Sequence, residues 1–137
     1  MPAHWILKTE PSTYAFSDLR REGIARWDGI TNAQALIHLR AMTKGDRVLV
    51  YHSGAEKALV GRGTIARAAY PDPAAGDPKL VAVDVRAGDP LPQRVTLAEI
   101  KADPAFRELG LVRNSRLSVV PLPPALFERL LALAGVR

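Results

Sequence analysis

The chain has 137 residues, no cysteine, and 19 lysines and arginines against 14 aspartates and glutamates. This length allows one domain with a substantial core, and an apolar content of 47% excludes a disordered chain. The lack of cysteine excludes disulfides, thiolate metal sites and a cysteine nucleophile, and it fits a reducing cytoplasm. The net charge of +5 indicates a modest affinity for polyanions.

Hydrophobic periodicity and turn residues predict short strands and helices that alternate along the chain. In chain order they are a strand over 4–8, helices over 18–22 and 32–42, strands over 47–52, 59–70 and 80–86, a helix from 96, a helical turn from 104, a strand over 116–121, and a helix from 124. Turns are expected at 44–46 and 89–92, and a proline-rich loop at 71–78. No apolar run reaches the roughly 18 residues of a membrane helix, and the N-terminus carries no signal-peptide pattern.

Several residues mark the ends and irregularities of these elements. Ser17 and Asn32 are expected to cap the first two helices, and Thr96 with Glu99 forms a capping box for a later one. Gly61 and Gly63 lie inside a predicted strand, where glycine indicates a bulge or a close backbone approach. Strands separated by turns, with helices grouped between them, predict an α+β fold in which short strands curl into a small open barrel.

The stretch from Trp27 to Asn32 is the most informative part of the sequence. Trp27 precedes the turn pair Asp28-Gly29, and Asn32 then opens a helix with an apolar face. A large ring on a stiff turn beside a helix N-terminus is suited to form the wall of a small pocket. The alternative is that Trp27 belongs to the core and Asn32 only caps the helix.

Two further polar stretches could border the same pocket. Lys8 and Glu10 stand where the first strand ends, either as a pocket edge or as a surface salt bridge. Tyr51, His52 and Ser53 end another strand, where Tyr51 and Ser53 share one face and His52 points the other way. For His52 the alternative is a buried, hydrogen-bonded core position.

The segment from Arg113 to Ser118 places two arginines among small polar residues. Arg113 and Arg116 could contact phosphates or stack on bases, or they could belong to an ordinary solvated turn.

The usual enzyme motifs are missing from the sequence. Gly61-Arg62-Gly63 lacks the third glycine of a dinucleotide fingerprint, and no P-loop is present. The three histidines lack metal-ligand spacing, and Ser53 has no nucleophile-elbow sequence around it. We therefore predict no catalytic residues, no metal and no cofactor.

Six segments, in order and with compatible spacing, resemble the EVE domain family, whose fold is similar to PUA domains. They are 5–11, 27–32, 39–46, 51–53, 69–73 and 111–119. The resemblance covers nearly the whole chain and implies a single domain over 1–137. Two departures from the family pattern stand out. Thr31 stands where family members often have a basic residue, and the 74–79 segment is shorter than in many bacterial members.

The resemblance implies an α+β, PUA-like open β-barrel of about five to six mainly antiparallel strands flanked by short helices. It also implies a non-catalytic module that binds a modified or flipped base of DNA or RNA. Matched positions carried over to the base pocket are Lys8, Glu10, Trp27, Asn32, Tyr51, His52 and Ser53, and those for the nucleic-acid backbone are Arg113 and Arg116. We expect a monomer in the cytoplasm, without membrane contact. The alternatives are an enzyme that uses His52 and Glu10 on a nucleotide-like molecule, and a protein-interaction domain without a pocket.

Overall fold

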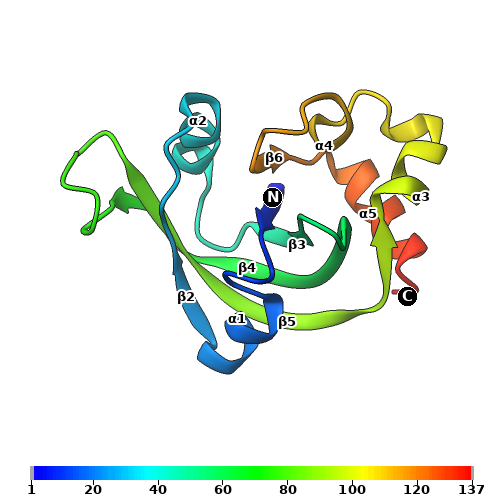
Figure 1. Ribbon diagram of the computed structural model, residues 1–137, viewed down its shortest axis with the longest axis horizontal. Coiled ribbons are helices and arrows are strands. Elements are labelled where there is room, and N and C mark those ends of the chain that lie inside the picture. Colours follow the sequence, from blue (N-terminus) through cyan, green and yellow to red (C-terminus); the bar gives the residue numbers. More distant parts are fainter. Residues whose placement is uncertain (1, 137) are drawn as a thin grey trace.

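A computed structural model describes residues 2–136 and shows a curved, six-stranded sheet with helices around it (Figure 1). The strands are β1 (His4–Thr9), β2 (Ile24–Trp27), β3 (Arg47–His52), β4 (Ala58–Pro71), β5 (Val81–Thr96) and β6 (Val119–Pro121). The helices are α1 (Phe16–Glu22), α2 (Ala33–Ala41), α3 (Leu97–Ala102), α4 (Gly110–Arg113) and α5 (Pro124–Leu133), with a 3-10 helix, η1, over Pro104–Phe106. The predicted α+β class is confirmed.

The strands follow the order β2-β5-β4-β3-β1-β6 across the sheet. β1 pairs with β3 in parallel, and the other neighbours are antiparallel. β4 and β5 are long and curve through much of the molecule (Figure 1). β2 and β6 are the two outer strands, so the sheet does not close on itself. This arrangement confirms the predicted open, PUA-like barrel of mainly antiparallel strands.

Two glycines allow β4 to bend where other elements press against it. A Cβ atom on Gly61 would lie 2.3 Å from the Phe16 ring, and one on Gly63 would lie 2.8 Å from the Arg86 carbonyl oxygen. The β4–β5 register shifts on both sides of Gly61. Side chains at these positions would push α1 and β5 away, so the predicted bulge and close approach are both confirmed.

The helices occupy separate parts of the sheet. α1 packs on β2 and β5, α2 packs on β4, β5 and β6, and α3 to α5 gather at the other end of β5 (Figure 1). The core between them is apolar, and it contains the predicted buried face of β5, Val81, Val83 and Val85. Within residues 2–136, no helix is both long and apolar enough to span a membrane.

The structure corrects two predictions about β2 and β5. Trp27, which precedes Asp28-Gly29 as described, ends β2, a short edge strand that the sequence pattern did not show. The turn predicted at 89–92 is wrong, because β5 runs through it to Thr96. Pro90 is tolerated there since it faces Gly61, where the β4–β5 register shifts and the regular ladder of hydrogen bonds is interrupted.

Two shorter corrections concern the first helix and the last strand. α1 begins at Phe16 and not after Ser17, because the Asp18 carboxylate accepts from the Ala15 N–H at 2.8 Å. The last strand covers only Val119–Pro121, and the preceding residues form α4 and a turn. The predicted caps at Asn32 and Thr96 are confirmed.

Candidate functional site

A cleft of about 690 Å³ opens beside β2, next to the end of β1 and to α1. Aromatic rings and charged side chains line it together, which is the usual composition of a small-ligand site. The lining residues are Lys8, Thr9, Glu10, Thr13, Tyr14, Glu22, Ile24, Ala25, Arg26, Trp27, Asp28 and Ile30.

Two aromatic rings meet at one corner of this cleft. Trp27 pairs with Val83 of β5 and is 7% exposed, so most of its ring packs in the core and part of it borders the cleft. The Tyr14 ring meets it edge-on, with centroids 6.0 Å apart at an interplanar angle of 83°. The backbone holds Tyr14 in place, since its N–H donates to the Glu10 carbonyl at 2.8 Å and its carbonyl accepts from the Thr9 hydroxyl at 2.6 Å. A planar heterocycle entering the cleft would meet a preorganised aromatic corner.

Charged groups surround the aromatic corner. The Tyr14 hydroxyl donates to the Glu22 carboxylate at the end of α1. Burial and this hydrogen bond both raise the pKa of Tyr14, so its hydroxyl stays protonated at neutral pH. On β1, Lys8 Nζ donates to the Ser115 carbonyl at 3.0 Å, and burial lowers the pKa of Lys8. The cleft therefore offers both hydrogen-bond acceptors and a cation.

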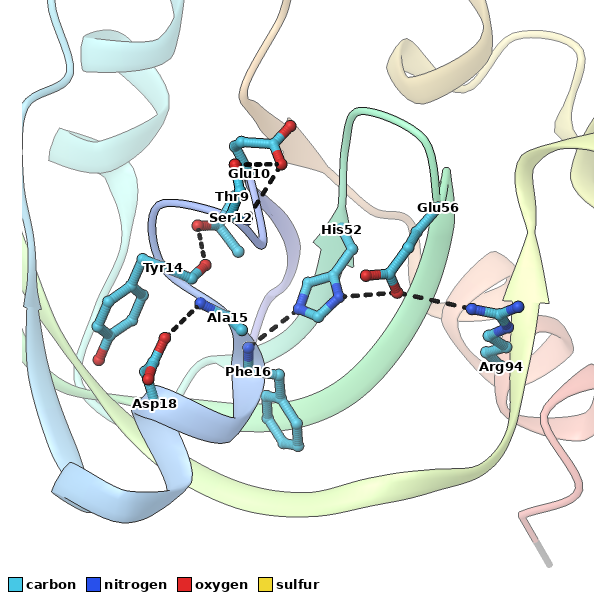
Figure 2. A network of polar contacts seen from close by, with 10 residues as sticks. All are labelled: Thr9, Glu10, Ser12, Tyr14, Ala15, Phe16, Asp18, His52, Glu56 and Arg94. Carbon is cyan, nitrogen blue, oxygen red and sulfur yellow. Dashed lines mark hydrogen bonds and ion pairs between the residues drawn. The ribbon is translucent and has the colours of Figure 1, made fainter.

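The end of β1 is tied to the turn after β3. The Ser53 N–H donates to the Thr9 carbonyl at 2.9 Å, and a Cβ atom on Gly54 would lie 2.3 Å from Glu10 Oε2. Glu10 itself accepts from the Ser12 N–H at 3.1 Å and from the Ser12 hydroxyl at 3.0 Å (Figure 2). Of the predicted pocket residues, Glu10 thus lines the cleft, and Ser53 supports the strand end beside it.

Tyr51 and His52 belong to the buried part of β3. Tyr51 is 3% exposed, and Lys8 Nζ lies 5.7 Å from the centre of its ring. His52 Nε2 accepts from the Phe16 N–H at 3.0 Å, and its Nδ1 lies 3.1 Å from the Glu56 carboxylate (Figure 2). Both nitrogens of this buried ring are therefore occupied by structural partners. Direct contact of Tyr51 or His52 with a ligand stays a prediction.

The three other predicted site residues lie outside the cleft lining. Asn32 accepts from the Ala35 N–H at 2.9 Å and caps α2, while its side chain remains exposed. Arg113 ends α4 and pairs with Glu108. Arg116 is exposed in the following turn, which the Lys8 hydrogen bond to Ser115 connects to the strand end at the cleft.

The structure adds cleft residues that the sequence pattern did not assign to the pocket. Tyr14, Glu22 and Arg26 come from a turn, a helix end and a strand whose meeting depends on how α1 packs against β2 and β5. The only sequence signal was the presence of a second aromatic, Tyr14, in the turn after β1.

A second hollow lies between α2 and the C-terminal elements. It measures about 740 Å³, and its lining is largely apolar, with Trp5, Leu122 and neighbouring prolines. His38 borders it, as does His4, whose Nδ1 is buried without a partner among residues 2–136. In the same described range, no three His, Asp or Glu side chains gather to hold a metal ion. We call this hollow the apolar groove.

The open sheet and the one-sided aromatic cleft define a domain of the PUA-like class. The chain belongs to the EVE domain family, since the model of that family matches residues 3–133. This finding confirms the resemblance seen in the sequence.

Solved structures and curated sequences support the same assignment. A protein of Rhodopseudomonas palustris, solved by NMR, is 38% identical with a TM-score of 0.92, over 97% of this chain and 93% of that one. Human THYN1 protein, crystallised in complex with DNA containing 5-methylcytosine, is 27% identical with a TM-score of 0.88, over 98% of this chain and 99% of that one. The human sequence called thymocyte nuclear protein 1 is 28% identical over 97% of this chain and 74% of its own length.

Proposed function

We propose that this protein is a non-catalytic module that binds DNA carrying a modified base and holds that base in the cleft. The observation that carries the proposal is the aromatic corner of Trp27 and Tyr14, surrounded by the charged groups of the cleft. The human relative with the same fold was crystallised with DNA that contains 5-methylcytosine, which supports DNA as the ligand class. RNA, a monomeric state and a cytoplasmic location stay predictions.

The energetics of this function are compatible with the cleft. Extruding a base from a duplex costs a few kcal/mol. Stacking on an aromatic ring returns about 1–3 kcal/mol per base, and the cleft offers two rings. The net charge of +5 adds attraction to the phosphate backbone. Stacking and charge together can therefore offset the extrusion of one base.

Selectivity for the modified base requires more than stacking. Burying one methyl group contributes about 0.8 kcal/mol, which is roughly fourfold in affinity. Stronger discrimination depends on polar partners that a wrong base leaves unpaired. Glu22 borders the cleft, and an ionised carboxylate accepts hydrogen bonds but cannot donate them. We propose that this carboxylate favours bases with an exocyclic amino group, which cytosine and adenine have and thymine lacks.

The structure favours binding over the enzyme alternative. That alternative needs His52 and Glu10 to act as base and acid on one substrate. His52 instead bridges the start of α1 and Glu56, while the Glu10 carboxylate is directed at Ser12 (Figure 2). Because both ring nitrogens of His52 have partners outside the cleft, neither is free to move a proton there. The cleft also distinguishes this proposal from a protein-interaction domain without a pocket.

The test is a competition binding assay with duplexes that differ in one central base. 5-Methylcytosine, cytosine, N6-methyladenine and adenine are compared, with RNA of the same sequence as a further arm. We expect at least one modified duplex to bind about tenfold tighter than its unmodified partner. Equal affinity for every duplex would reject the proposed function, and tighter binding of modified RNA would reject DNA as the ligand.

A further inference from the structure

Three neighbouring strands place two arginines in a row across the sheet, next to the cleft. Arg26 on β2 and Arg67 on β4 are both cross-strand partners of Asp84 on β5, which lies between them. Directly paired residues on adjacent strands share one face of a sheet, so the three side chains project from the same face. A polar hollow of about 460 Å³ includes all three residues in its lining, together with Tyr70.

The positive charge of this row is not neutralised within the protein. Asp84 accepts from the Tyr70 hydroxyl, and among residues 2–136 no carboxylate oxygen lies within 4.0 Å of the Arg26 or Arg67 side-chain nitrogens. Both arginines are exposed. Two guanidinium groups and one carboxylate leave a net positive charge on this face.

The Tyr70 ring holds one of the arginines in place. The Arg67 guanidinium carbon lies 4.0 Å from the centre of the Tyr70 ring, a distance typical of a cation–π contact. A stacked guanidinium keeps its N–H groups free at the edge of its plane, in the fork that suits a phosphate. This contact reduces the side-chain entropy that Arg67 loses when it binds an anion.

The hollow and the cleft share one wall. Ile24, Ala25 and Arg26 border both of them, because β2 separates the two. When a base is drawn into the cleft, the phosphates of that strand remain outside it. The row of Arg26 and Arg67 is therefore positioned to meet the backbone on the β2 side, whereas Arg116 stands in the turn tied to Lys8.

We infer that Arg26 and Arg67 form a phosphate-binding subsite for the DNA strand whose base enters the cleft. The inference rests on the proposed function and adds the contact surface that positions the strand. Phosphate contacts position the protein without reading the base. The subsite should therefore strengthen binding to every duplex equally.

The experiment measures the dissociation constant of modified and unmodified duplexes between about 50 and 200 mM salt. R26A and R67A should each reduce the slope of log affinity against log salt by about 0.9, the value for one phosphate contact. In R67A, which lies outside the cleft lining, the ratio of affinities for modified and unmodified DNA should stay unchanged. R107A removes another exposed arginine, which follows η1, and serves as the matched control, with a wild-type slope expected.

The outcomes separate this inference from the function on which it rests. Slopes of R26A and R67A equal to that of R107A would overturn the subsite, even if the wild type still discriminates modified DNA. A lower ratio for modified DNA in R67A would also overturn it, since the residue would then read the base. If the wild type binds all duplexes equally, the proposed function fails, while a reduced slope on unmodified DNA would still support the phosphate subsite.

Discussion

The two tryptophans of this chain have nearly the same exposure and very different surroundings. Trp5 is 6% exposed and Trp27 is 7% exposed, and each borders a hollow. The Trp5 indole N–H donates to the buried Asp46 carboxylate at 2.9 Å. The Trp27 indole N–H has no acceptor among residues 2–136, and the ring meets Tyr14 in the cleft.

The comparison shows that neither burial nor the size of a hollow distinguishes the proposed binding site from the apolar groove. The apolar groove beside Trp5 is slightly larger than the cleft beside Trp27. The cleft differs because aromatic rings and charged groups converge on it, which is the combination that orients a polar heterocycle. The Trp5 side of the molecule should therefore control stability, and the Trp27 side should control ligand binding.

The largest expected effect follows from removing the partner of Trp5. Asp46 is 1% exposed and accepts four hydrogen bonds, from the Trp5 indole, the Ala3 N–H, and the N–H and hydroxyl of Thr43. Each buried donor left unpaired costs about 1–3 kcal/mol. We expect D46A to lower the free energy of unfolding by about 3 kcal/mol or more, measured by urea denaturation. D89A, which removes an exposed carboxylate, is the control, and equal losses in both variants would contradict this role of Asp46.

The same carboxylate should make stability sensitive to acid. Burial acts to raise the pKa of Asp46, but hydrogen bonds from Thr43, Trp5 and Ala3 outweigh it and hold the pKa below its usual value. The unfolded chain therefore binds this proton more readily than the folded one, and the stabilisation is lost as the pH falls through the lowered pKa. Between about pH 5 and pH 2, the wild type should lose more stability than D46N. Parallel pH profiles would show that other carboxylates dominate.

On the cleft side, the ring of Tyr14 should matter more than its hydroxyl. Trp27→Ala is a poor test, because truncating a ring in the core costs about 3–5 kcal/mol of stability. Tyr14 stands in a turn and is only partly buried. Tyr14→Leu should weaken binding of the preferred duplex about 5- to 150-fold, while Tyr14→Phe keeps the stacking surface and most of the affinity.

Circular dichroism checks that both Tyr14 variants are folded. Tyr51→Phe is the control in β3. A loss of affinity there as large as in Tyr14→Leu would indicate that the ligand contacts Tyr51. If Tyr14→Leu binds the duplex with wild-type affinity, the aromatic corner does not contact the base.

The sequence predicted the fold better than the site, for a physical reason. Helix caps such as Asn32 and the alternating valines of β5 are local signals, so they could be read from a few neighbouring residues. β2 has only four residues, too few to show a period, and Pro90 looked like a turn because its strand partner at Gly61 is distant in sequence. The cleft depends on contacts between α1, β1 and β2, which no local pattern records.

The positions of the predicted site residues show the same limit of local sequence patterns. Lys8, Glu10 and Trp27 line the cleft, and their contact with a base stays a prediction. Tyr51 and His52 were also expected there, but in β3 both faces of the strand are covered and these side chains are buried. Alternation along a strand tells which residues share a face, and it does not tell what covers that face.

A smaller effect is expected when the acceptor in the cleft is changed. Glu22→Gln replaces a carboxylate, which only accepts hydrogen bonds, with an amide that can also donate. The preference for amino-bearing bases over thymine should fall by about tenfold, equivalent to about 1.4 kcal/mol. The measurement compares the affinities of duplexes that differ in one central base. Asp28→Asn, another lining residue of the cleft, tests whether loss of charge alone explains the change, and the same loss in both variants would contradict a specific role for Glu22.

The smallest effect is expected from a substitution in the apolar groove. The comparison of the two tryptophans predicts that such a substitution leaves DNA binding unchanged. His38 borders the groove, its ring centre lies 6.0 Å from that of Trp5, and it contacts Gln34 on the preceding turn of α2. His38→Ala should change the affinity for modified DNA by less than about twofold, because no charged or aromatic group of the cleft depends on this side chain. A selective loss of modified-DNA binding in His38→Ala, with unchanged stability, would place the base beside Trp5 and reverse the roles of the two tryptophans.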